Sequence, residues 1–265
     1  MIEILILCLT GILVGFLAGL FGIGGGLIIV PIVTFLMIHF NDLPGADAYA
    51  YGIGSSMLSI IFTGSMATFF HMKNNNFNFS YVSNNVIGYL FFGSIVGSYI
   101  IHFANFYFLK YFFIFYCFFS ALKLLNQANL NFLYSLPLKT IGFIFGALSS
   151  IVGIGGGTLF VPYLEAKKID IKLAISSSSL LGVVIGMGTI LGFVSQNLIL
   201  ETSPLLNSFF DYGNIYIKSF IFLTLPSIFT IFLSTKLLVS LNQNIIKKLF
   251  AYILIIIGLI SLFNL

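Results

Sequence analysis

Two glycine clusters are the residues whose type and spacing suggest chemistry. Each reads Gly-Ile-Gly-Gly-Gly, first at 22–26 and again at 153–157. A helix does not readily continue through three adjacent glycines, each costing about 1 kcal/mol relative to alanine, so a new helix should begin near the end of each cluster. Free N–H groups at a helix N-terminus favour an anion. The glycines expected to bind one are Gly22, Gly24, Gly25 and Gly26, and Gly153, Gly155, Gly156 and Gly157.

Serines form a second set of candidates. Ser55 and Ser56 follow the first cluster, and Ser177 and Ser178 lie within a run of four serines after the second. A hydroxyl can donate to an oxyanion without carrying charge, although serines inside helices often bond to the carbonyl four residues back instead. Both pairs are expected one to two turns into the second helix of each half, which follows the glycine-broken segment. We therefore expect Ser55, Ser56, Ser177 and Ser178 to join the glycines at one site.

The composition shows which environment must position these residues. Of the 265 residues, 59% are apolar and 7% are charged, whereas soluble domains are roughly a quarter charged. The chain therefore belongs in a bilayer, and we predict an all-α polytopic integral membrane protein. Six apolar runs are long enough to cross: 50–70, 81–102, 106–125, 172–195, 215–237 and 245–263. The glycine clusters interrupt two further apolar regions, 4–38 and 138–164.

The two interrupted regions are copies of one another. Residues 11–31 match residues 142–162 at 10 of 21 positions, including the whole glycine cluster and a closing Val-Pro. Weaker matches align 54–64 with 176–186, and 110–112 with 248–250. We predict a single membrane domain, 1–265, built from an N-terminal repeat (1–130) and a C-terminal repeat (131–265). Each repeat has one glycine-broken segment, which could re-enter, and three transmembrane helices.

Lysine placement favours one of two orientations of the repeats. If each broken segment crosses the membrane, the 11 lysines divide 4 to 7 between the faces. If each is a hairpin that enters and leaves by one face, the repeats are inverted and the division becomes 9 to 2, with Lys110 and Lys218 outside. Cytoplasmic loops carry the excess of positive charge, so the hairpin arrangement with both termini outside is favoured. In that arrangement the hairpin tips meet near the membrane midplane.

Several other classes of function lack the residues they require. All seven acids lie near segment ends or in loops, which argues against a cation channel or proton pump. The glycine cluster lacks the preceding strand and following acid of a dinucleotide loop, and a Ser-His hydrolase would have about four helical turns between Ser56 and His71. His39, His71 and His102 are expected as interfacial anchors. We expect no enzyme activity, cofactor or metal, and no nucleic-acid partner.

The doubled glycine motif resembles the sulfite exporter TauE/SafE family of membrane transporters. The resemblance rests on Gly15–Gly26 with Pro31, on Gly146–Gly157 with Pro162, and on the small-residue stretches Ala50–Ser56 and Ala174–Ser178. The Thr-Ser pair of the family reads Ser-Ser in both halves, which keeps a hydroxyl. A family tryptophan near the third segment is replaced by Tyr81.

The resemblance implies a multi-pass permease of the bacterial inner membrane. Its substrate would be a small anion such as sulfite or an organosulfur compound, carried by alternating access around the paired glycine motifs. The expected partners are this anion, the lipid bilayer and, if the protein forms an oligomer, a second copy of the chain. The alternative is a non-transporting membrane scaffold or assembly component, which would keep the repeat for packing alone.

Overall fold

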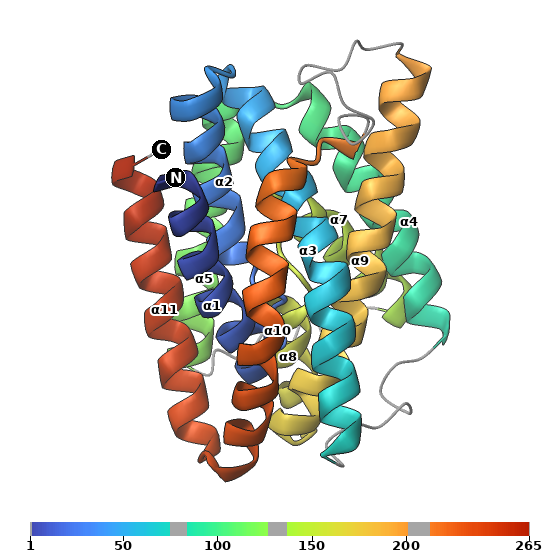
Figure 1. Cartoon of the computed structure of the whole chain (residues 1–265). Coiled ribbons are helices and arrows are strands. Elements are labelled where there is room, and N and C mark those ends of the chain that lie inside the picture. Colours follow the sequence, from blue (N-terminus) through green and yellow to red (C-terminus); the bar gives the residue numbers. More distant parts are fainter. Residues whose placement is uncertain (1, 75–83, 127–136, 201–212, 265) are drawn as a thin grey trace.

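The computed structural model describes residues 2–74, 84–126, 137–200 and 213–264, and these residues form helices joined by short connections (Figure 1). The helices of the first half are α1 (Ile2–Phe21), α2 (Gly26–Asn41), α3 (Gly45–Lys73), α4 (Asn84–Phe103) and α5 (Phe106–Asn126). Those of the second half are α7 (Leu138–Val152), α8 (Gly157–Ala166), α9 (Ile171–Ile199), α10 (Ile217–Ser240) and α11 (Gln243–Asn264). The predicted all-helical fold is confirmed for the described residues. The predicted repeat boundary between 130 and 131 lies outside them.

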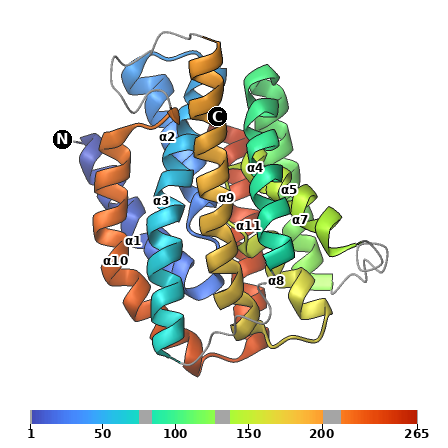
Figure 2. The ribbon, with the colours of Figure 1, turned by 90° about the vertical axis from the view of Figure 1, so that its right-hand side faces the viewer.

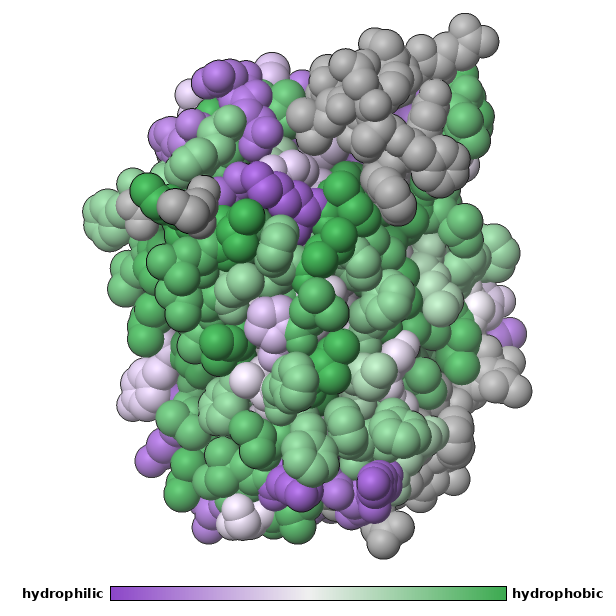
Figure 3. All heavy atoms as spheres, in the orientation of Figure 1, coloured by the Kyte–Doolittle hydropathy of each residue, from purple (hydrophilic) through white to green (hydrophobic). Residues whose placement is uncertain are grey.

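The chain has the hydrophobicity of a multi-pass integral membrane protein. Among the described residues, seven helices are long and apolar enough to cross a membrane: the six predicted segments, now seen as α3, α4, α5, α9, α10 and α11, and also α1. Large apolar side chains face outward, among them Phe229 at 78% exposure and Phe115 at 64%. Figure 3 shows an apolar belt across the face in view, with hydrophilic residues gathered toward its two ends. Lipid is the solvent that this belt requires.

The two glycine clusters end one helix and start the next, as expected. The second helices begin at Gly26 and Gly157, the last glycine of each cluster, near which the sequence predicts their start. In Figures 1 and 2, α1 runs inward from the end that holds both termini and α2 returns to that end. The α7–α8 hairpin enters from the opposite end. Each broken segment is therefore a hairpin in the described structure.

The two halves interlock through corresponding helices. Helix α1 packs on α10 and α7 packs on α4, so each hairpin lies against a helix of the other half, while α3 packs on α9 and α5 on α11. Small residues permit this close approach: Gly11, Gly15 and Gly19 of α1 face α10, and Gly93 and Gly97 of α4 face α7. Glycine spaced four residues apart is typical of helix pairs in membranes.

The serine-bearing helices form the centre of the molecule. Helix α3 starts at Gly45, earlier than expected, so Ser55 lies nearly three turns into it, at about 3.6 residues per turn. The prediction of one to two turns was wrong for α3 but holds for α9, which begins at Ile171. Asp47 is tolerated in the first turn of α3 because a carboxylate there stabilises the helix N-terminus. The extra turns place Ser55 and Ser56 deep in the bundle.

Candidate functional site

Each break is held by backbone conformations that suit glycine. Gly22, Gly24 and Gly25 have φ of 66°, 70° and 85°, and Gly153 has φ of 76°. Gly25 caps α2, and a Cβ there would also meet the side chain of Val14. A left-handed conformation costs other residues about 1–2 kcal/mol. The first cluster has three glycines in this conformation and the second has one. Replacing glycine should therefore strain the backbone at more positions in the first break than in the second.

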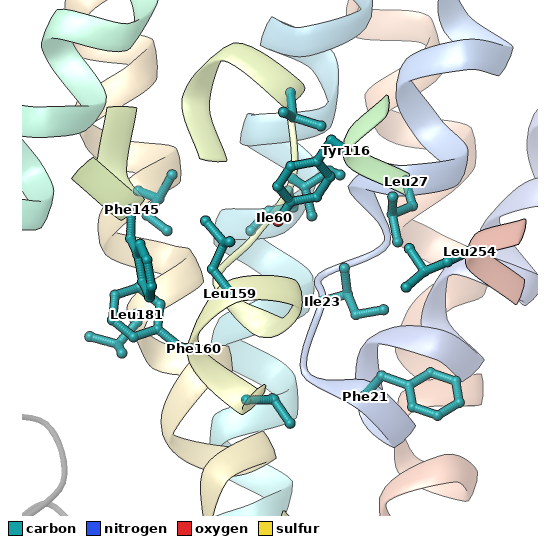
Figure 4. Packing of buried hydrophobic residues seen from close by; sticks show 14 of the residues in the cluster. Phe21, Ile23, Leu27, Ile60, Tyr116, Phe145, Leu159, Phe160, Leu181 and Leu254 are labelled. Atoms are coloured by element: carbon teal, nitrogen blue, oxygen red, sulfur yellow. The ribbon is translucent and has the colours of Figure 1, made fainter. Parts of the chain in front are cut away.

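The tips of the two hairpins touch each other. The Gly155 N–H donates to the Ile23 carbonyl oxygen at 3.2 Å, which is a backbone hydrogen bond between the two glycine clusters. A Cβ on Gly157 would lie 2.8 Å from the carbonyl oxygens of both Phe21 and Gly22, and a Cβ on Gly26 would collide with the Gly153 carbonyl. Figure 4 shows the two extended segments passing one another among buried apolar residues. The expected meeting of the tips is confirmed.

Free backbone donors converge where the tips meet. In the described part of the chain, the N–H groups of Gly26 and Leu27 at the start of α2, and of Gly157 and Thr158 at the start of α8, have no hydrogen-bond acceptor. Helices α2 and α8 leave this point toward opposite ends of the molecule (Figure 1). Both positive dipole ends therefore point into one buried region.

Hydroxyl groups on the long helices fix the two breaks. Ser56 of α3 donates to the Gly153 carbonyl at 2.8 Å, and Thr63, about two turns further along α3, donates to the Gly24 carbonyl at 3.1 Å. Ser178 of α9 donates to the Ile175 carbonyl at 2.7 Å, and its oxygen would be 2.6 Å from a Cβ on Gly22. Ser56 and Ser178 therefore contact the glycine clusters, as the sequence predicts.

The other two predicted serines have different surroundings. Ser55 accepts a hydrogen bond from the Tyr216 N–H at 2.8 Å. Tyr216 in turn donates its phenol proton to Glu3 at 2.6 Å, and Glu3 pairs with Lys218 at 2.6 Å. Burial and the hydrogen bond to the Glu3 carboxylate raise the pKa of the Tyr216 phenol above its usual range, so it remains a donor.

Ser177 is fully buried, and its hydroxyl has no hydrogen-bond partner within the described residues. Of the four predicted serines, Ser56 and Ser178 are the two that contact the glycine clusters. Ser55 links the centre to the end of the molecule that holds the termini.

Besides Thr63, two hydroxyls close to the tips were missed by the sequence interpretation. Tyr116 of α5 and Thr158 of α8 form a hydrogen bond, and both side chains are buried. Thr158 follows the second glycine cluster directly, which was a usable signal. Tyr116 is one of 13 tyrosines and carries no signal of its own in the sequence.

The centre is polar without being charged. Within the described residues, the buried polar side chains include Ser, Thr, Tyr, Asn, Gln and one His, and no Asp, Glu or Lys is buried. A positive potential there must come from backbone amides and helix ends. The region is also closed, because every residue at 22–27 and 153–164 is buried.

One histidine differs from its expected position. His71 is 0% exposed, so the prediction of an interfacial anchor was wrong for this residue. It lies near the end of α3 beside the Gly19 backbone of α1. His71 is about 22 Å from Ser56 along one helix, at about 1.5 Å per residue. The two residues do not approach each other as a nucleophile and base would.

The interleaved helical hairpins, the apolar belt and the paired breaks define a polytopic membrane protein of the transporter type with discontinuous helices. Residues 7–260 match the model of the family described as Sulfite exporter TauE/SafE. The chain belongs to this family of membrane transporters.

Similar proteins occur in bacteria and in an archaeon. A "Probable membrane transporter protein" of Haemophilus influenzae is 31% identical over 98% of both chains. One of the same description from Methanocaldococcus jannaschii is 27% identical over 98% of this chain and 94% of the relative. The "Probable membrane transporter protein YunE" of Bacillus subtilis is 28% identical over 60% of this chain and 66% of its own. No solved structure matches the chain.

Proposed function

We propose that the protein carries a small anion across the membrane through the point where its two glycine breaks meet. The single observation that carries this proposal is the convergence of two helix N-termini, with unpaired N–H groups, in a buried region without a buried Asp, Glu or Lys among the described residues. Such N-termini attract anions through their amides and their dipoles. Negative charge is therefore the ligand property that this centre favours.

The substrate class we propose is a sulfur oxyanion, namely sulfite or a small organosulfur anion. The family description supports this class. Each oxygen of such an anion can accept from an amide or a hydroxyl, and Ser56 and Ser178 lie beside the breaks. The glycines allow the backbone to approach the anion without interference from Cβ atoms. We assign binding to Gly22, Gly24–Gly26, Gly153, Gly155–Gly157, Ser55, Ser56, Ser177 and Ser178.

The transport cycle we propose is alternating access. The breaks are closed in the described arrangement, so an anion can reach them only if packing at the tips loosens. Because the α1–α2 hairpin opens at one end and the α7–α8 hairpin at the other (Figure 2), movement of one hairpin exposes the centre to one side of the membrane. Movement of the other exposes it to the opposite side.

We also propose an orientation and a cellular location for the protein. With both termini outside, nine lysines lie on the inner side, as the positive-inside rule requires. We place the protein in the bacterial inner membrane, with Lys110 and Lys218 on the outer face.

Flux measurements test the proposed function directly. Purified protein in liposomes is given sulfite, sulfate, thiosulfate or methanesulfonate, with protein-free liposomes as the control. We expect saturable uptake of a sulfur oxyanion, reduced by competing oxyanions. Monodisperse, helical protein that moves none of the four would contradict the proposal and favour a scaffold role.

A further inference from the structure

We infer that the anion binds one-sidedly, at the N-terminus of α8, and that the hydroxyls of Tyr116 and Thr158 are its specificity-determining ligands. This inference rests on the proposed function and adds residues that neither the glycine motif nor the serine pairs contain. It also predicts that the N-terminus of α2, although built from the same motif, contributes less to binding.

The first observation is a buried hydroxyl cluster at the start of α8. The Tyr116 hydroxyl and the Thr158 hydroxyl are hydrogen-bonded to each other. Both residues are buried, with exposed fractions of 5% for Tyr116 and 2% for Thr158. Ser120, one turn along α5, is a further hydrogen-bonding neighbour of the Tyr116 hydroxyl. In Figure 4 the Tyr116 ring extends from α5 toward the segment that joins α7 to α8. The cluster therefore adjoins the free N–H groups of Gly157 and Thr158.

The second observation is that the other half lacks this cluster. The alignment of the glycine motifs pairs Thr158 with Leu27, and the alignment of 110–112 with 248–250 pairs Tyr116 with Leu254. Helix α5 packs on α8 and α11 packs on α2, so the corresponding helices meet in the same way. Leu27 and Leu254 are both buried and lie together in Figure 4. Equivalent positions thus carry two hydroxyls in one half and two leucines in the other.

The difference matters because an oxyanion needs a donor for each oxygen. A pair of hydroxyls that bond to each other uses one proton for that bond and keeps the second proton for another acceptor. Beside α8, two hydroxyls supplement the two amides and the helix dipole. Beside α2, the leucines donate nothing, and a charged oxygen next to them would lose hydration without replacement. The anion should therefore lie toward α8.

The test measures sulfite binding and uptake in variants of the intact protein. Tyr116→Phe and Thr158→Val remove one hydroxyl each, whereas Thr158→Ser retains it. Leu27→Val is the matched change in the other half, and Thr34→Val removes a buried, unpartnered threonine hydroxyl two turns along α2. The half-saturating sulfite concentration is read from liposome uptake, and binding is read independently from the rise in Tm that sulfite causes. Size-exclusion profiles and the Tm without sulfite show that each variant is folded.

We expect Tyr116→Phe and Thr158→Val to raise the half-saturating concentration about tenfold or more, the loss typical of a hydrogen bond to a charged group. Thr158→Ser, Leu27→Val and Thr34→Val should stay within about twofold of wild type.

Two results would overturn the inference while leaving the proposed function intact. One is wild-type affinity in Tyr116→Phe and Thr158→Val. The other is an equal loss of affinity in Leu27→Val and Thr34→Val, which would mean that the losses reflect altered packing and not the removal of a hydroxyl that binds the anion. If wild type shows neither sulfite uptake nor a rise in Tm, sulfite is not its substrate, and both the proposed function for this anion and the one-sided site are rejected.

Discussion

The Ser56 hydroxyl illustrates how a single side chain joins the two halves at the centre. It donates to the Gly153 carbonyl, 97 residues away in the sequence. Ser56→Ala leaves this buried carbonyl without its donor, and hydrogen bonds inside membrane bundles contribute about 0.6–1 kcal/mol. We expect a lower Tm in detergent and slower anion uptake.

Ser65→Ala is the matched control, because the Ser65 hydroxyl is exposed and bonds to the Ile61 carbonyl within its own helix. An equal loss of Tm in Ser56→Ala and Ser65→Ala would show that the contact with Gly153 contributes nothing specific.

The residues of the site were predictable to different degrees. The glycine clusters could be identified from the sequence, because a repeated helix-breaking motif is unusual in an apolar segment. Ser56 and Ser178 were found because they occur at corresponding positions of a repeat. Tyr116 could not be found, because its role depends on α5 meeting α8. That contact joins segments about forty residues apart and has no local pattern.

At the scale of helices, the close pairing of α1 with α10 rests on glycine. A Cβ on Gly15 would meet the backbone of Ser227 and the hydroxyl of Thr230. Gly15→Leu should therefore force the helices apart, at about 3 kcal/mol for an overpacked contact, and lower the Tm accordingly. Gly88→Leu on α4 is the control, because a Cβ there meets nothing within 4 Å. Equal stability of the two variants would mean that α1 and α10 do not pack as described.

Helix starts and membrane crossings were predictable from the sequence, but helix partners were not. Hydropathy located six crossings, and the glycine clusters predicted that α2 and α8 start near Gly26 and Gly157. Hydropathy does not say which apolar faces meet, since lipid and protein are equally apolar. The cross-pairing of α1 with α10 and of α7 with α4 is therefore information that only the structure supplies.

For the whole molecule, the inverted arrangement predicts opposite sidedness for the two hairpin exits. Pro44 follows α2 and Lys167 follows α8, and both are exposed. In a protein whose Cys8 and Cys117 are replaced by alanine, Pro44→Cys should react with a membrane-impermeant maleimide in intact cells. Lys167→Cys should react only after the membrane is opened. Labelling of both from one side would require parallel repeats instead.

The central claim is that the meeting point of the two glycine breaks is the path of a small anion, and one comparison tests it most directly. Sulfite uptake into liposomes is measured for wild type, Gly156→Leu and Gly88→Leu, at equal amounts of inserted protein. A Cβ on Gly156 would lie 2.9 Å from the Ser178 carbonyl oxygen, so Gly156→Leu fills the centre, whereas Gly88 is open. We predict saturable uptake by wild type and Gly88→Leu and none by folded Gly156→Leu. Undiminished uptake by Gly156→Leu would contradict the claim and place the path elsewhere.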